Sequence, residues 1–404
     1  MTKFYIKQKI DVVILCGGLG TRIKKLSKGI PKSLIPINKK NILTYIINEI
    51  KKYNFNKIYL LTGYKSKLFK RYNKVKPYLI PIECLAEKKL MGTGGSLYQL
   101  KKKKINDFLL INGDSLLLTN YLDLVNLNKK KIGSIALTKN KNYKSNNKLA
   151  NLSLKKNLIS FTKKEKLMNG GVYFFKKNFL NLIKNEFFSL ENDLLESLIR
   201  KKSINGISAN NFFLDIGTSK NLKEAPKILF DRFNKPAVFL DRDGVINYDY
   251  GYVSKFKNFI LRPGVLKGLK LLQKKDYLIF IITNQAGIAK KKFSENDFEK
   301  LHLQFKDFHL KNGILINDLV YCPYHKESKI KKYRIDSDWR KPNNGMIRHL
   351  LKNYDINMSK SFMIGDNESD KKCANKSKIY FEYSKKNFYT QVKNILERRN
   401  YDKK

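Results

Sequence analysis

Two carboxylates placed directly after a short apolar run are the most reactive arrangement in this sequence. Asp241 and Asp243 follow the run Ala237–Leu240 and are two residues apart, so both side chains lie on the same side of an extended backbone. An aspartate at such a position can attack phosphorus, while its neighbour protonates the leaving oxygen and later activates water. Because two like charges this close together need a cation, the pair predicts a phosphate site with Mg²⁺.

A glycine-rich turn near the N-terminus predicts a second phosphate site. The apolar run Val12–Cys16 is followed by the stretch Gly17-Gly18-Leu19-Gly20-Thr21-Arg22. Glycine has no Cβ, so the backbone can approach a ligand and hold phosphate oxygens with its N–H groups, and Arg22 can add a bidentate contact. The spacing fits neither the dinucleotide-binding fingerprint nor the Walker form. The turn alone therefore predicts phosphate contact without naming the ligand.

Short apolar runs that end in Gly or Asp alternate with amphipathic stretches such as Ile42–Tyr53 and Val265–Lys275. This alternation predicts βα units of parallel sheets, whose ligands lie at the carboxyl ends of the strands. The two candidate sites are too far apart in the chain for one simple unit, and 404 residues exceed one ordinary domain. We predict an α/β fold with two Rossmann-like parallel-sheet domains in tandem, residues 1–232 and 233–404, which meet in the charged, proline-containing segment Phe230–Pro236.

Further motifs follow the glycine-rich turn in a fixed order. They are Pro31-Lys32-Ser33-Leu34-Ile35-Pro36, Gly92-Thr93-Gly94-Gly95, Asn112-Gly113-Asp114, Asn169-Gly170-Gly171-Val172-Tyr173 and Asp215-Ile216-Gly217-Thr218. Together with the turn they resemble the sugar-1-phosphate nucleotidyltransferases, over residues 10–230. Ser189-Leu190-Glu191 resembles a stretch of the heptose-1-phosphate guanylyltransferase branch. The resemblance implies the nucleotidyltransferase fold and, for that branch, transfer of GMP from GTP to a heptose 1-phosphate.

The same resemblance implies roles for individual residues. Arg22 would face the β- and γ-phosphates, Lys32 would face the transferred phosphoryl group, and both would be catalytic. Asp114 and Asp215 would hold Mg²⁺. The family's Glu-Lys pair reads Thr162-Lys163 here, which is a departure. The nucleotide would contact Gly17, Gly18, Gly20, Thr21, Gly92, Thr93 and Gly94, and the sugar phosphate would contact Lys163, Asn169, Gly170 and Glu191.

The residue types suit this reaction. An oxygen of the sugar 1-phosphate would attack the α-phosphate of a nucleoside triphosphate, and pyrophosphate would leave. Because the attacking phosphate is already ionised, no general base is needed. The protein has to position anions and neutralise the charge that builds up at phosphorus, which carboxylate-bound Mg²⁺ and basic side chains can do.

The acidic pair after residue 240 has partners further along the chain. They are Thr283 after the apolar run Leu278–Ile282, Lys341 in Arg340-Lys341-Pro342, and Asp366 with Asp370 after Phe362–Gly365. This order resembles the haloacid dehalogenase superfamily, in which a nucleophilic aspartate is followed by a phosphate-binding hydroxyl, a lysine and metal-binding aspartates. The resemblance implies that Asp241 and Asp243 are catalytic, that Thr283, Asn284, Arg340 and Lys341 bind the substrate, and that Asp241, Asp243 and Asp366 bind Mg²⁺.

Longer stretches narrow this second resemblance. They are Asp241-Arg242-Asp243-Gly244-Val245-Ile246-Asn247, Tyr252-Val253, Thr283-Asn284-Gln285-Ala286-Gly287-Ile288, Tyr321-Cys322-Pro323 and the motif around Arg340-Lys341-Pro342 with Gly345-Met346. They are similar to the D-glycero-D-manno-heptose 1,7-bisphosphate phosphatases, over nearly all of residues 237–375. The histidinol-phosphate phosphatases share this scaffold and are the nearest alternative.

One feature of this phosphatase family is incomplete here. The family commonly binds one Zn²⁺ through a Cys-Pro-His and a later Cys-x-Cys just before Arg-Lys-Pro. The corresponding stretches read Cys322-Pro323-Tyr324-His325 and Ser337-Asp338-Trp339. A structural zinc site needs four ligands, which Cys322 and His325 alone cannot supply. We predict that zinc is absent and that packing of Tyr324 and Trp339 holds the loop.

The charge of the chain offers a different interpretation. Lys and Arg number 83 against 34 Asp and Glu, a net charge of +49, which suits a basic nucleic-acid-binding protein. However, the lysines are spread through both halves, and only 11 of the 83 are arginine, the residue suited to bidentate recognition of bases. We therefore favour a compositional bias, with small molecules and not nucleic acid as partners.

The cysteines and the apolar runs bear on the compartment. The four cysteines are scattered without CxxC pairs, which argues against a disulfide framework. Residues 1–9 do not form a signal peptide, and no run approaches the roughly 18 apolar residues of a membrane span. We expect a cytoplasmic protein without a membrane partner, and leave its oligomeric state open.

The favoured hypothesis joins both resemblances in a bifunctional enzyme of nucleotide-activated heptose synthesis. The C-terminal half would remove the 7-phosphate of a heptose 1,7-bisphosphate, and the N-terminal half would couple the remaining heptose 1-phosphate to a nucleoside triphosphate. Because these reactions are consecutive, their fusion is chemically sensible. The alternative keeps both folds with other substrates, as a hexose-1-phosphate nucleotidyltransferase joined to a histidinol-phosphate-type phosphatase.

Overall fold

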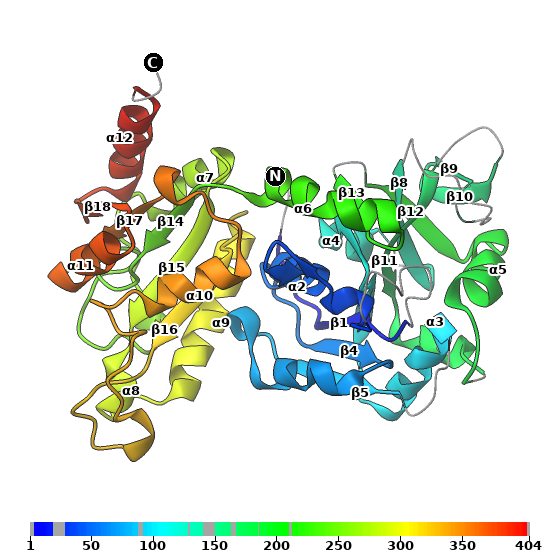
Figure 1. The fold of residues 1–404 in the computed structure, drawn as a ribbon, viewed down its shortest axis with the longest axis horizontal. Coiled ribbons are helices and arrows are strands. Elements are labelled where there is room, and N and C mark those ends of the chain that lie inside the picture. Colours follow the sequence, from blue (N-terminus) through cyan, green and yellow to red (C-terminus); the bar gives the residue numbers. More distant parts are fainter. Residues whose placement is uncertain are drawn as a thin grey trace. The chain divides into compact units, whose positions relative to one another are not determined.

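The computed structural model (Figure 1) describes residues 4–18, 29–87, 92–127, 130–139, 149, 151–162, 167–184, 186–209 and 212–401. It divides into two compact units. The N-terminal unit comprises Ile6–Ile50 and Phe55–Ile228, and the C-terminal unit comprises Met1–Tyr5, Lys51–Asn54 and Leu229–Lys404. Each unit is built around a sheet of its own.

The N-terminal unit contains a nine-stranded sheet. In spatial order its strands are β5 (Ile82–Ala86), β4 (Ile58–Thr62), β1 (Ile10–Leu15), β6 (Asp107–Asn112), β11 (Leu167–Phe175), β8 (Gly133–Lys139), β12 (Ile204–Ser208), β10 (Leu158–Phe161) and β9 (Leu152–Lys155). The first four are mutually parallel, whereas β11 is antiparallel to both β6 and β8. Val12, Val13 and Ile14 of β1 are fully buried, so both faces of the sheet are covered at this strand.

Short helices and two small strand pairs lie between the strands of this sheet along the chain. The α-helices are α2 (Ile42–Ile50), α3 (Gly92–Gly95), α4 (Tyr121–Asn126), α5 (Glu196–Arg200) and α6 (Ser219–Phe233); the 3-10 segments are η2 (Lys32–Leu34), η3 (Ser66–Lys74), η4 (Pro77–Leu79), η5 (Ser96–Lys102) and η7 (Lys177–Leu182); η8 (Leu190–Leu195) is a π-helix. The strand pairs are β2 (Pro36–Ile37) with β3 (Lys40–Asn41) and β7 (Ser115–Leu118) with β13 (Phe212–Asp215). The Asn41 side chain accepts hydrogen bonds from the N–H and hydroxyl of Thr44 and so caps the start of α2.

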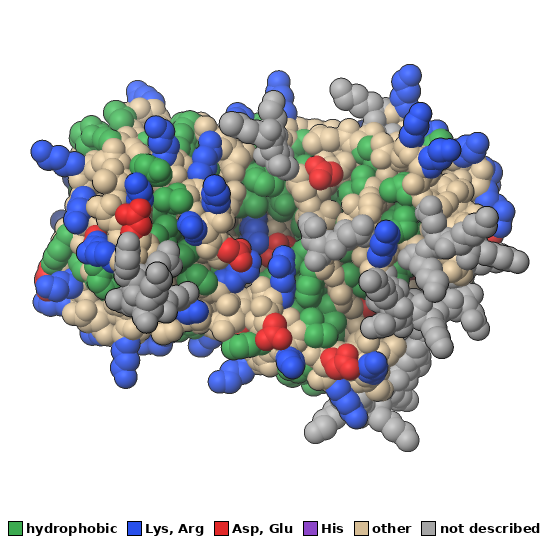
Figure 2. All heavy atoms as spheres, turned by 90° about the horizontal axis from the view of Figure 1, so that it is seen from above, with side chains coloured by type: hydrophobic (Ala, Val, Ile, Leu, Met, Phe, Trp, Pro, Cys, Tyr) green, Lys and Arg blue, Asp and Glu red, His purple; other side chains and the backbone are tan. Residues whose placement is uncertain are grey.

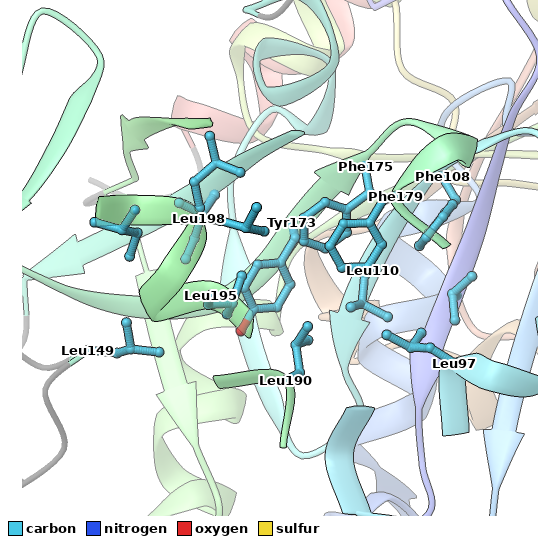
Figure 3. Packing of buried hydrophobic residues seen from close by; sticks show 14 of the residues in the cluster. Leu97, Phe108, Leu110, Leu149, Tyr173, Phe175, Phe179, Leu190, Leu195 and Leu198 are labelled. Atoms are coloured by element: carbon cyan, nitrogen blue, oxygen red, sulfur yellow. The ribbon is translucent and has the colours of Figure 1, made fainter. Parts of the chain in front are cut away.

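Aromatic rings and leucines fill the core beside β6 and β11 (Figure 3). Phe175 and Phe179 are stacked, with their ring centroids 3.7 Å apart. Leu190 and Leu195 of η8 are fully buried in the same cluster, and burial of one such leucine contributes about 1.5–3 kcal/mol. This burial fixes the segment that carries Glu191 against the sheet.

The C-terminal unit contains a five-stranded sheet in which all neighbouring strands are parallel. In spatial order they are β16 (Asp318–Cys322), β15 (Leu278–Asn284), β14 (Ala237–Leu240), β17 (Phe362–Gly365) and β18 (Tyr380–Tyr383). Every residue of β14 and β17 is buried, as expected for inner strands of a parallel sheet covered on both faces.

Six α-helices accompany this second sheet. They are α7 (Val265–Lys274), α8 (Ala286–Ala289), α9 (Glu295–Lys311), α10 (Gly345–Asn353), α11 (Glu368–Lys376) and α12 (Phe388–Tyr401), with the 3-10 segments η9 (Phe256–Asn258), η10 (Lys331–Tyr333) and η11 (Met358–Lys360). Two of them begin with capping boxes, Ser294 with Asp297 in α9 and Asn367 with Asp370 in α11. The second box anchors Asp370 at the start of its helix.

The structure confirms the predicted α/β class. β14 and β17 match the predicted apolar runs residue for residue, and α7 covers nearly all of the predicted amphipathic stretch. The larger sheet is mixed, however, and not purely parallel. Antiparallel neighbours need only a short turn, such as Lys156-Asn157 between β9 and β10, whereas parallel neighbours need a longer crossover. The boundary after residue 232 stays a prediction.

The surface shows how the basic residues are distributed. Lysine and arginine side chains are spread over the face seen in Figure 2 and do not gather in one patch. Within the described part of the chain, no helix combines the length and the apolar character needed to cross a bilayer.

Candidate active sites

The first candidate site lies where β1 and β6 end side by side. Leu15 of β1 pairs with Asn112 of β6, and the Gly113 N–H donates to the Leu15 carbonyl (2.9 Å). Parallel neighbours end at the same edge of a sheet. The structure therefore brings the end of β1, which leads into Gly17, next to the segment that carries Asp114, although the two motifs are far apart in sequence.

Asp114 and Asp215 are placed next to each other by the β7–β13 pair. Ser115 pairs with Asp215, and the Ile216 N–H donates to the Asp114 carbonyl (3.1 Å). Lys32 Nζ lies 3.3 Å from Asp114 Oδ2. The segments that carry the two predicted ligands are therefore adjacent along their backbones. Carboxylates are oxygen ligands of the kind that Mg²⁺ prefers, and the metal site itself stays a prediction.

A bulge in β11 places the motif that is predicted to contact the sugar beside this edge. The pairing of β11 with β8 shifts its register between Asn169 and Tyr173. Gly171 has a φ of +71°, which favours glycine, and a Cβ there would lie 2.9 Å from Ser115 Oγ. Asn169 Nδ2 donates to the Tyr173 hydroxyl (2.5 Å), and its Oδ1 accepts from the Gly171 N–H (2.9 Å). The bulge thus holds Asn169 close to the segment that carries Asp114.

Thr93 and Glu191, for which the sequence predicts contacts with different parts of the substrates, are joined directly. Thr93 Oγ1 donates to Glu191 Oε2 (2.6 Å) and accepts from the Leu190 N–H (3.2 Å). The Gly94 N–H donates to the carbonyl of Phe188 (3.1 Å). Hydrogen bonds therefore join the loop Gly92–Gly95 directly to the segment Phe188–Glu191.

The second candidate site lies at the carboxyl edge of the five-stranded sheet. Asp241 directly follows β14, Thr283 lies near the end of β15, and Asp366 directly follows β17. Because β14 pairs with both β15 and β17, these side chains come from three adjacent strands. The structure brings them together as predicted from the ends of the apolar runs.

Lys341 reaches this edge from a loop. Its Nζ lies 2.8 Å from Asp241 Oδ1 and 2.7 Å from Asp370 Oδ1, and it donates to the Ile282 carbonyl (3.1 Å). Burial by itself would lower the pKa of Lys341, but the two carboxylates raise that pKa above its usual range. The two carboxylates therefore favour the charged form of this lysine.

Three carboxylates form a group that could hold a metal ion. Oxygens of Asp241, Asp366 and Asp370 lie within 4.8 Å of one another. Asp370 Oδ2 also accepts from the N–H groups of Asp366 (3.2 Å) and Asn367 (3.1 Å), which fixes its orientation. Because three negative charges face the single ammonium of Lys341, a divalent cation with a preference for oxygen ligands fits this group.

Burial opposes ionisation at this group. It raises the pKa of Asp241 to about 7, against the lowering effect of Lys341. Burial and then the charge of Asp370 likewise raise the pKa of Asp366. A cation favours the ionised forms of nearby carboxylates, and an aspartate has to be ionised to attack phosphorus.

Asp243 occupies a different environment from these three carboxylates. The Arg242 guanidinium donates to both of its oxygens, from Nη2 to Oδ1 (2.8 Å) and from Nη2 and Nε to Oδ2 (2.6 and 3.0 Å). Asn247 Nδ2 donates to Oδ1 (2.9 Å), and Gln285 Nε2 donates to Oδ2 (3.1 Å). Asp370, and not Asp243, is therefore the third member of the carboxylate group.

Gly244 allows this loop to approach the neighbouring strand end. Its φ is +76°, and a Cβ there would lie 2.1 Å from Asp366 Oδ2. Any larger residue would be strained in its backbone and would displace Asp366. The Arg262 guanidinium donates to the Gly244 carbonyl and holds the loop from the other side.

The sequence predicts Asn284 and Arg340 as substrate-binding residues. In the structure, Asn284 contacts the backbone of Lys341, and Arg340, which directly precedes Lys341, contacts Tyr324. Asn284 Oδ1 accepts from the Lys341 N–H and its Nδ2 donates to the Lys341 carbonyl, both at 3.0 Å. Arg340 Nη1 donates to the Tyr324 carbonyl (3.4 Å). In the structure, Asn284 therefore positions the backbone of the buried lysine.

The stretch that corresponds to the zinc loop is held by protein contacts. Cys322 is fully buried and its Sγ lies 3.9 Å from the Tyr324 carbonyl. His325 Nδ1 accepts from the Glu327 N–H (3.2 Å). The ring of Tyr324 contacts Tyr333, and Trp339 contacts His349, with centroids 6.4 and 4.9 Å apart. These ring contacts agree with the packing predicted for the loop.

Comparison with protein families decides the nature of the N-terminal unit. The model of the family described as "Nucleotidyl transferase" matches residues 11–231, which is more than half of the chain. The chain belongs to the nucleotidyl transferase family. A solved structure of HddC from Yersinia pseudotuberculosis is 23% identical and covers 54% of this chain and 99% of that chain, with a TM-score of 0.46.

The rest of this nucleotidyl transferase chain matches known phosphatases. The family described as "Polynucleotide kinase 3 phosphatase" matches residues 247–395. A protein of Rhodopseudomonas palustris named D-glycero-beta-D-manno-heptose-1,7-bisphosphate 7-phosphatase is 39% identical over 163 residues, which are 40% of this chain and 91% of that protein. A Vibrio cholerae protein of the same name is 43% identical over 141 residues, 35% of this chain and 75% of that protein.

Both parts of the nucleotidyl transferase–phosphatase chain belong to families that generally use divalent metal ions, typically Mg²⁺. In the transferase part, the backbone segments that carry the predicted ligands Asp114 and Asp215 are adjacent. Four residues predicted for that part lie outside the described residues, namely Gly20, Thr21, Arg22 and Lys163.

The sequence patterns assign no role to several residues at the phosphatase site. Arg242 and Gln285 stand inside quoted motifs, yet only the folded chain shows that they contact Asp243. Asn247 belongs to the same set. Asp370 is different, because the motif order already names it with Asp366, although the predicted ligand set has Asp243 in its place.

Proposed function

We propose that this protein is a bifunctional enzyme of nucleotide-activated heptose synthesis. Its phosphatase part, residues 233–404, removes the 7-phosphate of a D-glycero-D-manno-heptose 1,7-bisphosphate. Its transferase part, residues 1–232, transfers GMP from GTP to the heptose 1-phosphate and releases pyrophosphate. The observation that carries the proposal is the 39% identity with a named heptose bisphosphate phosphatase, in one chain with a nucleotidyl transferase. The product of the first reaction is the acceptor of the second.

In the proposed phosphatase reaction, Asp241 attacks phosphorus and Asp243 handles the protons. Asp241 lies on the carboxyl edge beside Thr283, whose hydroxyl binds the phosphoryl group. Lys341, 2.8 Å from Asp241, neutralises charge on the phosphoryl oxygens. Asp241, Asp366 and Asp370 would hold Mg²⁺, which adds charge neutralisation at phosphorus when bound.

In the proposed transferase reaction, the protein positions two anions without a general base. Lys32, which lies 3.3 Å from Asp114, faces the phosphoryl group in transfer, and Arg22 faces the leaving pyrophosphate. The Thr93–Glu191 hydrogen bond couples the nucleotide loop to the segment that contacts the sugar phosphate. Asp114 and Asp215 would hold Mg²⁺, which neutralises charge at the α-phosphate when bound.

Product identification tests the proposed function. Purified protein is incubated with Mg²⁺, the α or β anomer of heptose 1,7-bisphosphate, and GTP, ATP, CTP or UTP. We expect inorganic phosphate, pyrophosphate and GDP-heptose, with GTP used at least about tenfold faster than the other triphosphates, because base discrimination needs hydrogen bonds that the wrong base leaves unmade. Mass spectrometry identifies the products.

The same assay separates the alternatives. Faster use of glucose 1-phosphate than of heptose 1-phosphate, together with release of phosphate from histidinol phosphate, would replace heptose as the substrate. Release of phosphate from a 3′-phosphorylated oligonucleotide, or tight DNA or RNA binding that weakens steeply with salt, would point to nucleic acid instead. The proposal is supported if phosphate is released from heptose 1,7-bisphosphate, pyrophosphate is released during transfer to heptose 1-phosphate, and none of these other activities is found.

We also predict that the phosphatase part works without zinc. The buried Cys322 thiol faces a backbone carbonyl, and His325 Nδ1 already accepts a local N–H. Elemental analysis of protein purified without chelators should show less than about 0.1 zinc per chain, because two ligands do not close a tetrahedral site. Exposure to a strong chelator should leave the thermal midpoint unchanged. Stoichiometric zinc would contradict the prediction.

A further inference from the structure

A single glutamine amide connects two functional side chains of the phosphatase site. Gln285 Nε2 donates to Thr283 Oγ1 (2.9 Å) and to Asp243 Oδ2 (3.1 Å). Gln285 is 3% exposed and Thr283 is 1% exposed, so both side chains have little freedom to turn. In this arrangement the amide nitrogen, and not the amide oxygen, faces both Asp243 and Thr283, so one NH₂ group donates to both side chains.

This arrangement determines how Thr283 can use its hydroxyl. A hydroxyl group donates one hydrogen bond and accepts others. Because Thr283 Oγ1 already accepts from the amide, its own hydrogen remains directed toward another acceptor. A phosphoryl oxygen at the end of β15 would be such an acceptor. The amide thus favours the donor orientation that phosphate binding requires.

The same amide fixes the orientation of Asp243. Arg242 donates to both oxygens of this carboxylate and Asn247 donates to Oδ1, whereas Gln285 donates to Oδ2 from the residue after β15, an element separate from theirs. Arg242 is buried and also donates to the Val253 carbonyl (3.0 Å), so it supports the fold as well. Of the three residues that donate to Asp243, Gln285 is therefore the one to replace in order to test orientation of the carboxylate without removing a support of the fold.

We propose that Gln285 is a positioning residue that aligns the acid–base Asp243 with the phosphate-binding Thr283. The inference rests on the roles of Asp241 and Asp243 in the proposed function. In the first step Asp241 forms a bond to phosphorus, the bond from phosphorus to the substrate oxygen breaks, and that oxygen takes a proton from Asp243. In the second step water gives a proton to Asp243 and attacks phosphorus, which releases phosphate and restores Asp241.

A leaving-group experiment tests the role of Gln285. p-Nitrophenyl phosphate has a leaving group that departs without protonation, so a misplaced Asp243 slows mainly the second step. Gln285→Leu and the isosteric Gln285→Glu should lower kcat by about 10- to 100-fold, since small misplacements of catalytic groups have effects of this size. Both variants should show a rapid burst of one p-nitrophenolate per chain before the slow steady state. Asp243→Asn should show the same burst.

Gln391→Leu is the matched control. Gln391 is 2% exposed, and its Nε2 also donates to a carboxylate at 3.1 Å, that of Glu382. This control should show no burst and a kcat within about twofold of the wild type, because it lies outside the reacting groups. Steady-state kinetics without a burst in both Gln285 variants would overturn the inference. If wild-type protein hydrolyses p-nitrophenyl phosphate but no heptose bisphosphate, the proposed substrate fails while the test of Gln285 still stands.

Discussion

Replacing Asp241 with asparagine should stop phosphate release, with kcat lowered by about 10³-fold or more, the scale on which positioned acid, base and nucleophilic groups act. The amide cannot form the covalent bond to phosphorus that the carboxylate forms. The buried Lys341 keeps its contact with Asp370 at 2.7 Å, so the variant should remain folded. Phosphate release from heptose 1,7-bisphosphate measures the effect, and thermal unfolding checks the fold.

Two controls make this result specific. Nucleotidyl transfer to heptose 1-phosphate supplied directly should be unchanged in Asp241→Asn. Asp276→Asn removes a carboxylate that is 72% exposed and pairs with Lys235 on the surface of the same unit; its loss should cost less than about 1 kcal/mol and leave both activities intact. Normal phosphate release by Asp241→Asn would show that another group is the nucleophile.

Replacing Asp114 with asparagine should abolish nucleotidyl transfer, also by about 10³-fold, because the loss of charge stabilisation at phosphorus has effects of this size. The substitution removes a negative oxygen ligand beside Asp215 and the partner of Lys32. Any residual activity should need a higher Mg²⁺ concentration, since one charged ligand is missing. Pyrophosphate release from GTP and heptose 1-phosphate provides the measurement.

Asp107→Asn is the matched control for this second prediction. Asp107 begins β6, the strand whose other end leads to Asp114, and its Oδ1 accepts from the Lys177 N–H (2.9 Å). This variant should keep both activities. Loss of phosphate release in Asp114→Asn, together with loss of transfer, would argue against two independent active sites in the chain.

Much of both sites follows from local sequence. The runs that precede Asp241 and Asp366 are short, apolar and end abruptly, and each forms an inner strand with the aspartate at its carboxyl end. A fully buried strand needs continuous apolar residues, and its ligand groups can stand only where the strand leaves the sheet. For this reason the amino-acid sequence alone predicts the positions of Asp114, Asp241, Thr283 and Asp366.

Contacts between distant residues do not follow from these patterns. The Thr93–Glu191 hydrogen bond joins residues 98 positions apart, and it depends on the buried leucines of η8. The antiparallel orientation of β11 does not follow from its sequence, because an apolar run does not show in which direction the strand lies in the sheet. Strand direction and loop contacts depend on how complete elements pack, and a local window carries no such information.

The sequence by itself determined the α/β class, the strand ends that carry the carboxylates and the order of the motifs in both units. Each of these depends on residues that are close together in the chain. The order of the motifs already placed Asp370 with Asp366 among the metal-binding aspartates of the resemblance. Only the tertiary structure decided that the oxygens of both lie within 4.8 Å of those of Asp241, and that Arg242, Asn247 and Gln285 orient Asp243. Buried carboxylates need charged or hydrogen-bonding partners, and which partners reach them is set by packing that brings separate strands and loops to one edge of the sheet.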